Sequence, residues 1–183
     1  MKYFSTIRLG LIAALLAAPL AVLGKTYEAI KGESKLTYHL HHPMHEIEGT
    51  SSDFICTVDL NSDTAHSRIH VKASVESFRT GNSSRDSHAL EIMQGFKYPF
   101  VEFTSDSVRH EEKGYRVFGN LNFHGVTRPM NFVVTPEYLN GKVCIKGGFV
   151  VLLSDYKLER PSLLFVSTDN DLHIDLNVLT VGP

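Results

Sequence analysis

The chain has 183 residues, 43% of them hydrophobic, and its formal net charge is −2 at pH 7. This length fits one domain that either buries a core or encloses a cavity. The mildly acidic balance, with no basic block, argues against nucleic acid as a partner.

The first 24 residues have the pattern of a secretory signal peptide. A basic start precedes an apolar run, and Val22 and Gly24 are small enough for the −3 and −1 positions before Lys25. An uncleaved membrane anchor is the alternative, because the apolar run is long for a signal peptide. We expect a domain at 25–183 with 16 basic and 20 acidic residues, hence a charge of −4. It would be periplasmic or secreted, with no stable membrane anchor.

Alternation of apolar and polar side chains with period two recurs along the domain and predicts about eight β-strands. The expected strands span residues 34–42, 53–60, 68–78, 100–108, 115–123, 130–136, 142–153 and 171–181. No long helix alternates with them, which excludes a parallel α/β sheet. Antiparallel strands with one apolar face fit a sandwich or a closed barrel, and an eight-stranded barrel can hold a small ligand.

A polar insert within residues 77–103 interrupts this pattern. Ser84 or Asp86 is expected to cap a short helix, and Gly95 to end it. An apolar stripe at helical spacing lies between them, formed by Ala89, Ile92 and Met93. A short helix with one apolar face between two strands predicts a lid over one open end of a barrel.

Two Arg–carboxylate pairs beside apolar residues are candidates for the rim of such a barrel. Arg85–Asp86 and Glu159–Arg160 are each expected to fasten a loop to the rim, although either Arg could instead bind an anionic head group. Arg128 is expected to be a solvated turn residue.

Four histidines occur in the segment HLHHPMHE, residues 39–46. On a strand His39 and His41 point the same way, roughly 7 Å apart, and could bind a metal or haem if His45 folded back toward them. The alternative is that they are outward polar residues of one strand. His42 falls on the apolar face, where it would bond either a ligand head group or a buried carbonyl.

Motifs of nucleophilic, metal-dependent and phosphate-binding enzymes are absent from the sequence, so we expect no catalytic residues. Export would permit a disulfide between Cys56 and Cys144. Strand parity argues against it, because Cys56 shares a face with apolar residues and Cys144 shares one with lysines.

Several motifs together resemble the YceI-like family of exported, lipocalin-like proteins that bind polyisoprenoids or other lipids. They are Thr80-Gly81-Asn82, the Arg85-Asp86 pair, Tyr98-Pro99 through Phe103 and Ser105, and the segment from Gly119 to Arg128. The resemblance covers the domain at 25–183. It implies an all-β fold, an eight-stranded antiparallel barrel with a short helical insert capping one end. It also implies an apolar tunnel, no catalysis and no cofactor beyond a bound isoprenoid or quinone-like lipid.

A hydrophobic long-chain lipid is therefore the expected partner, with a homodimer as one expected assembly. The alternative is that the inward side chains fill the barrel as a solid core. The residues expected in the tunnel are Tyr38, Leu40, His42, Val71, Ala73, Phe103, Gly119, Leu121, Phe123, Phe132 and Phe149. The residues expected in the cap and rim are Arg85, Asp86, Ile92, Met93 and Arg160.

Overall fold

The computed structural model describes residues 25–61, 63–139, 142–163 and 165–181. The predicted signal peptide at 1–24 lies outside these residues. Within the described ranges, no helix has both the length and the apolar character needed to cross a membrane.

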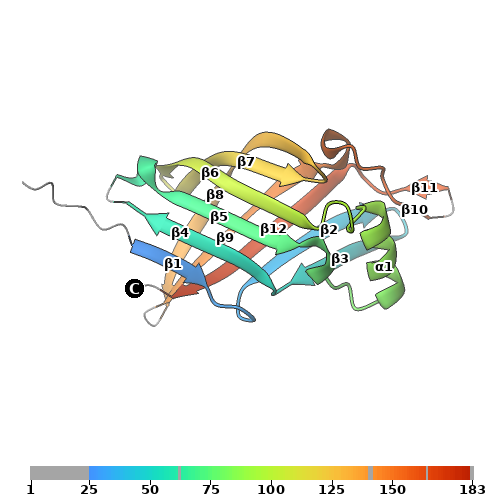
Figure 1. Ribbon diagram of the computed structural model, residues 1–183, viewed down its shortest axis with the longest axis horizontal. Helices are drawn as coiled ribbons and strands as arrows, with labels where there is room; N and C mark the ends of the chain where they lie inside the picture. The colour runs from blue at the N-terminus through green and yellow to red at the C-terminus, as the bar shows by residue number, and fades with distance from the viewer. Residues whose placement is uncertain (1–24, 62, 140–141, 164, 182–183) are drawn as a thin grey trace, which may run out of the picture.

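The described chain is mostly β-strand, with a single α-helix, α1, at Ser83–Ile92 (Figure 1). The strands are β1 Lys25–Ala29, β2 Lys35–His42, β3 His45–Ser51, β4 Phe54–Leu60, β5 Arg68–Ser74, β6 Phe100–Glu111, β7 Gly114–Phe123, β8 Val126–Leu139, β9 Lys142–Leu152, β10 Ser162–Leu163, β11 Val166–Ser167 and β12 Asp171–Val181. Three short 3-10 turns are η1 Thr64–His66, η2 Val75–Ser77 and η3 Leu153–Tyr156.

The strands form the predicted eight-stranded antiparallel barrel. The main sheet has the order β1-β4-β5-β6-β7-β8-β9-β12-β2-β3, and β1 also pairs with β12 to close it. Its ten segments make eight barrel strands because β1 and β2 are halves of one broken strand, and β3 and β4 are halves of the next. The register shows the break, since Glu28 pairs with Thr57 whereas Leu36 pairs with Ser51.

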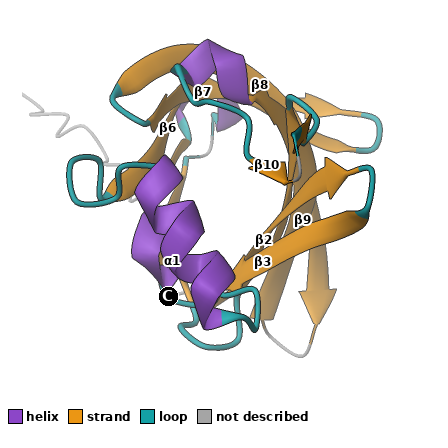
Figure 2. Ribbon diagram, turned by 90° about the vertical axis from the view of Figure 1, so that its right-hand side faces the viewer, coloured by secondary structure: helices purple, strands orange, loops and turns teal. Residues whose placement is uncertain are grey.

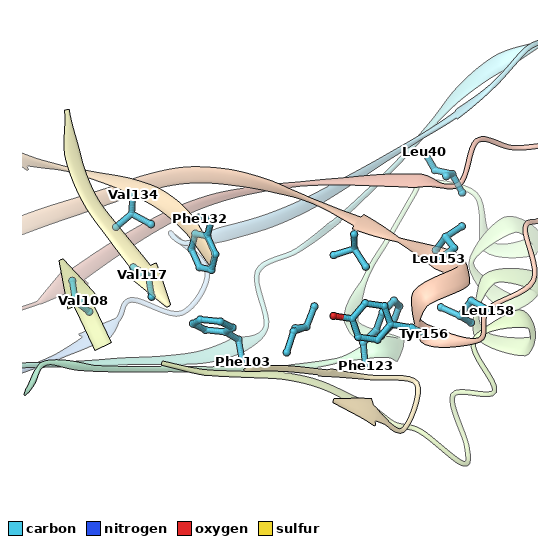
Figure 3. Close-up of a cluster of buried hydrophobic side chains, with 12 residues drawn as sticks. Leu40, Phe103, Val108, Val117, Phe123, Phe132, Val134, Leu153, Tyr156 and Leu158 are labelled. Carbon is cyan, nitrogen blue, oxygen red and sulfur yellow. The ribbon is translucent and has the colours of Figure 1, made fainter. Parts of the chain in front are cut away.

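The two ends of the barrel are built differently. At the end opposite α1, the interior is filled by Val108 and Val117 (Figure 3). At the other end, α1 and the segment 153–170, with its small β10–β11 hairpin, lie across the opening (Figure 2). The predicted helical insert thus does sit at one barrel end.

Helix α1 begins and ends at residues other than those predicted. Asn82 is the N-cap, and its Oδ1 accepts a hydrogen bond from the Arg85 backbone N at 3.1 Å, so neither Ser84 nor Asp86 has this role. Gln94, with φ of 47°, is the left-handed residue after the helix. Gly95 is needed for a different reason, because a Cβ there would overlap the Leu90 side chain.

Candidate functional site

The barrel encloses an apolar cavity of about 150 Å³, the inner cavity. This is roughly ten times the space that one water molecule needs, and apolar cavities of this kind stay dry and accept apolar guests. Eight of the residues predicted for the tunnel line it: Tyr38, Val71, Ala73, Phe103, Leu121, Phe123, Phe132 and Phe149. The barrel therefore holds open space in addition to its packed core.

Strand alternation explains why these residues face inward. Val71 on β5 pairs with Cys56 on β4 and with Phe103 on β6, and all three line the inner cavity. Because every second residue of a strand points to the same face, a period-two sequence directs a continuous apolar surface to the interior. The fold thus turns the sequence pattern into the cavity wall.

Three aromatic rings pack against one another in the wall of the inner cavity. The Phe132 ring centroid lies 5.2 Å from that of Phe103 and 4.9 Å from that of Phe149. Gly119, also predicted for the tunnel, is not among the lining residues. A Cβ on Gly119 would overlap the Phe103 ring and the Thr104 carbonyl, so this glycine is what allows Phe103 to lie across the barrel.

Two further cavities adjoin the inner cavity at the α1 end. The polar mouth, about 260 Å³, lies between α1 and residues 75–79. The apolar slot, about 80 Å³, lies between α1 and residues 153–161, and the predicted tunnel residue Leu40 lines it. Met93 lines all three cavities, whereas Ile92 lines the slot. The stripe on α1 therefore faces the open space.

Tyr38 stands where all three cavities meet. Its ring occupies the place that a side chain at Gly49 would take on the paired strand β3. Burial is the main cause that raises the pKa of Tyr38, and Asp86 raises it further while Arg85 lowers it. The hydroxyl thus stays protonated at neutral pH, and it has no hydrogen-bond partner among the described residues. It is available to donate to a ligand.

The predicted Arg85–Asp86 fastening pair is replaced by a contact between Asp86 and Thr80. Asp86 Oδ1 accepts hydrogen bonds from the Thr80 backbone N at 2.9 Å and from Thr80 Oγ1 at 2.6 Å. These bonds, the side-chain bond first, lower the pKa of Asp86. We call this contact the latch, because it ties the first turn of α1 to the chain that leads from β5.

On the other side of the opening, Arg128 carries out the role predicted for Arg160. Arg128 Nε donates to the Asp155 carbonyl at 2.9 Å, and its Nη2 lies 3.4 Å from Asp155 Oδ1. This contact fastens η3 to β8. Arg160 is exposed, and the described part of the chain gives it no ion pair with Glu159. Arg128 is therefore not the solvated turn residue that was expected.

The histidine cluster divides into separate pairs. His39 lies between Glu48 at 3.5 Å and Asp175 at 3.1 Å. His41 bonds Glu46, and this hydrogen bond raises the pKa of His41. No group of three potential metal ligands occurs among the described residues. The geometry thus does not favour the metal- or haem-binding alternative that used His39, His41 and His45.

His42 is fully buried, but it is not among the residues lining the three cavities. Its Nδ1 accepts from the Met44 backbone N at 3.2 Å, so the proton is on Nε2, which donates to the Val166 carbonyl at 3.0 Å. Of the two roles considered, bonding a buried carbonyl is the one that the structure shows. His42 joins the β2–β3 turn to the β10–β11 hairpin.

Both cysteines are free, as strand parity predicted, and both are buried, including Cys144 on the face that was expected to be polar. Cys56 lines the inner cavity, and burial raises the pKa of its thiol to about 12. Cys144 donates to Asn177 Oδ1 at 3.1 Å. The Cys56 thiol thus behaves as a small apolar group of the wall.

The sequence matches the model of the YceI-like domain over residues 27–178. The UPF0312 protein YE1254 of Yersinia enterocolitica is 35% identical over 68 residues, which cover 36% of this chain and 35% of that protein. Protein YceI of Salmonella arizonae is 32% identical over 85 residues, 45% of this chain and 44% of that protein. The matched segments thus span less than half the length of these curated relatives.

Two solved structures have a similar fold. BcnA of Burkholderia cenocepacia gives a TM-score of 0.76 at 16% identity, covering 82% of this chain and 98% of BcnA. A polyisoprenoid binding domain from Saccharophagus degradans, implicated in plant cell wall breakdown, gives 0.66 at 14% identity, covering 86% of this chain and 98% of that domain. At these low sequence identities, the structural similarity shows that the fold is shared and nothing further.

Proposed function

Because this chain belongs to the YceI-like family, we propose that it is a non-catalytic binding protein that sequesters or carries an isoprenoid or another long-chain lipid. The likeness to a polyisoprenoid binding domain supports this class of ligand. The observation that carries the proposal is the apolar inner cavity.

The lining of the inner cavity accounts for selection of a hydrocarbon chain. Its side chains are aliphatic or aromatic, apart from the Cys56 thiol and the Tyr38 hydroxyl. Each methylene group moved from water into such surroundings contributes about 0.8 kcal/mol. No charged residue lines this cavity, so a buried ionic group would find no partner and would be disfavoured.

The polar mouth accounts for selection of an uncharged head group. Asp86 is already bonded to Thr80, and Arg79 donates to the backbone carbonyls of Glu76 and Phe78. The hydroxyls of Tyr38, Ser83 and Ser87, which also border this mouth, have no hydrogen-bond partner among the described residues and remain as donors. A quinone-like carbonyl or an alcohol would match this mouth better than a phosphate, which needs uncommitted cations or N–H donors.

We also propose that the domain acts in the periplasm or outside the cell after cleavage following Gly24, without a stable membrane anchor. N-terminal sequencing of the protein from the periplasmic fraction of its own host tests the cleavage site. A chain that still begins at Met1 in the membrane fraction would contradict it. A homodimer remains a prediction, and light scattering of the purified protein tests it.

The experiment that tests the binding function is native mass spectrometry of the protein purified from its own host, followed by organic extraction. We expect a hydrophobic adduct that is lost on extraction and whose fragments identify the chain and head group. Stoichiometric zinc or copper on an otherwise ligand-free protein would contradict the proposal and restore the histidine alternative. A mass without any adduct, together with no uptake of added polyprenol, would refute the carrier function.

A further inference from the structure

Large apolar side chains project into solvent at the end of the barrel that carries α1. Among the described residues, two phenylalanines are fully exposed, Phe96 after α1 and Phe165 in the turn of the β10–β11 hairpin. Met44, in the β2–β3 turn, is 60% exposed. We call these three residues the apolar tips. All three segments lie at the α1 end of the barrel (Figures 1 and 2).

The apolar tips lie close in sequence to residues that line the apolar slot. Phe96 follows the slot residue Met93 by three positions, and Phe165 follows the slot residue Pro161 by four. Met44 follows the slot residue Leu40 by four positions. Three of the chain segments that line the slot therefore lead, within four residues, to an exposed apolar side chain.

The segments that carry two of the tips are held to one another. The His42 Nε2–H donates to the Val166 carbonyl, next to Phe165, and His42 Nδ1 accepts from the Met44 backbone N. The Asp169 backbone N also donates to the His41 carbonyl at 2.9 Å. The β2–β3 turn and the β10–β11 hairpin thus project as a connected unit, which argues against accidental exposure of loose loops.

We propose that the apolar tips dock this end of the barrel on the surface of a lipid bilayer, and that the ligand chain passes between bilayer and inner cavity through the apolar slot. The second part of this proposal, passage of the ligand chain through the slot, rests on the proposed carrier function. Aromatic and apolar side chains on separate loops can each enter the headgroup–acyl boundary of a bilayer, because a fluid surface adapts to each one. A water-insoluble ligand would then cross no aqueous gap.

A second copy of the chain fits this end less well. A stable protein interface buries about 800 Å² per partner on a continuous, complementary surface. The apolar tips stand on three separate loops, with the exposed polar residues His45, Gln94 and Lys97 close to them in the chain. Such a surface offers isolated contact points and no continuous patch.

The charges near the tips indicate that docking is mainly hydrophobic. Lys97 adjoins Phe96 and Arg160 lies on the hairpin side, but Glu91 and Glu159 offset them. We therefore expect vesicle binding to be similar on neutral and anionic bilayers and to persist at high salt. Binding that required anionic lipid and vanished in salt would contradict docking through the apolar tips.

Vesicle sedimentation tests the docking. The probes are large vesicles of phosphatidylcholine alone, and of phosphatidylcholine with phosphatidylglycerol in equal parts. Replacement of Phe96 or Phe165 by Ser should weaken binding about tenfold for each residue, because each change removes most of one phenylalanine's apolar burial. The control variants are Tyr138→Ser near the opposite end and Ile55→Ser on the barrel wall, which are also exposed and should leave binding unchanged.

A vesicle-free assay separates this proposal from the carrier function. Binding of a fluorescent polyene fatty acid, supplied as its uncharged methyl ester, in buffer reports on the inner cavity alone, and the Phe96→Ser, Phe165→Ser double variant should retain it. Loss of vesicle binding with retained probe binding supports the docking. Wild-type protein that binds the probe but no vesicles overturns the docking and leaves the carrier function standing.

Two other outcomes are also decisive. Wild-type protein that binds vesicles through the two phenylalanines but never takes up the probe would support docking and refute the carrier function. If light scattering shows a dimer that the double variant dissociates, and vesicles are not bound, the tips are an interface between copies and the bilayer proposal is overturned.

Discussion

The two ends of this barrel use the same strands for different purposes. At the end opposite α1, Val108 and Val117 are buried in the core and line none of the three cavities, and Val117 has no exposed surface (Figure 3). At the α1 end, the half-buried Met93 borders three cavities. One end is closed by side chains of the wall itself, and the other by separate segments laid across it.

This difference shows how a closed barrel can be both stable and open to a ligand. Branched side chains of the strands are held by the hydrogen-bonded sheet, so they can move apart only if the sheet does. Helix α1 instead has no buried residue and is tied to the barrel by the Asp86–Thr80 contact, whereas η3 is anchored by its buried Leu153 and Tyr156 and by Arg128–Asp155. Opening at this end can therefore proceed without breaking the sheet.

Filling the inner cavity with a larger side chain should remove the open space that distinguishes the α1 end of the barrel from the opposite end. Ala73 is buried in the wall of this cavity, and Ala73→Phe would occupy space needed by the ligand chain. Displacing about four methylene groups at 0.8 kcal/mol each should weaken polyene fatty acid binding by about two orders of magnitude. Fluorescence titration measures this. Ile55→Phe, on the outer face of β4, should leave affinity unchanged. Equal affinities of Ala73→Phe and wild type would place the ligand elsewhere.

A cavity at the filled end should reduce stability without affecting the ligand. Val117→Ala deletes two methyl groups at a position with no exposed surface, so the free energy of unfolding should fall by roughly 2 kcal/mol. Urea denaturation measures the loss, and Val150→Ala on the exposed outer face serves as the matched control. Release of the fluorescent fatty acid should proceed at the wild-type rate. Faster release from Val117→Ala would show that the two ends are coupled.

The sequence predicted the barrel more completely than it predicted the closure of its open end. Alternation identified the inward residues, since each strand encodes its own two faces in residue polarity. The segments 25–29 and 45–51 escaped because β1 has only five residues and because the inner face of β3 carries Gly49 and Ser51 beside Ile47, which weakens the apolar alternation. Eight barrel strands were nevertheless expected and found.

The polar contacts at the rim were predicted from adjacency in sequence, and this was misleading. Arg85 adjoins Asp86 in the chain, yet successive helical residues point in different directions, and Asp86 meets Thr80. Arg128 and Asp155 are far apart in the sequence and become partners only when η3 folds over β8. Ser84 and Asp86 were the expected caps, and Asn82 was missed although asparagine suits that position as well as serine and aspartate do.

Shortening the side chain that borders all three cavities should affect exchange more than stability. Met93→Ala would widen the passage beside α1, so release of the bound fluorescent fatty acid should be about tenfold faster, a barrier change near 1.4 kcal/mol. Stopped-flow competition with excess unlabelled lipid measures the rate. Glu91→Ala, exposed on the same helix, is the matched control. An unchanged release rate in Met93→Ala would mean that the ligand leaves by a route away from α1.

The smallest effect is expected from the latch. Asp86→Ala removes the acceptor of two hydrogen bonds from Thr80, and the freer helix should release the fatty acid about threefold faster, given the modest net value of partly exposed hydrogen bonds. Arg85→Ala, at the neighbouring position, should release it at the wild-type rate. An effect of Arg85→Ala as large as that of Asp86→Ala would contradict the latch and restore the sequence-based pair.

Protonation of Asp86 at low pH should weaken its hydrogen bonds to Thr80, which form the latch. Hydrogen bonds from Thr80 lower the pKa of Asp86, so the stabilisation is fully present above the ordinary carboxyl pKa of about 3.9 and is lost as pH falls through the lower folded-state value. Release from wild-type protein should thus be constant at pH above about 5 and accelerate only below about 4. Asp86→Ala should lack this acceleration. Acceleration that instead began near neutral pH would contradict control of the opening by Asp86.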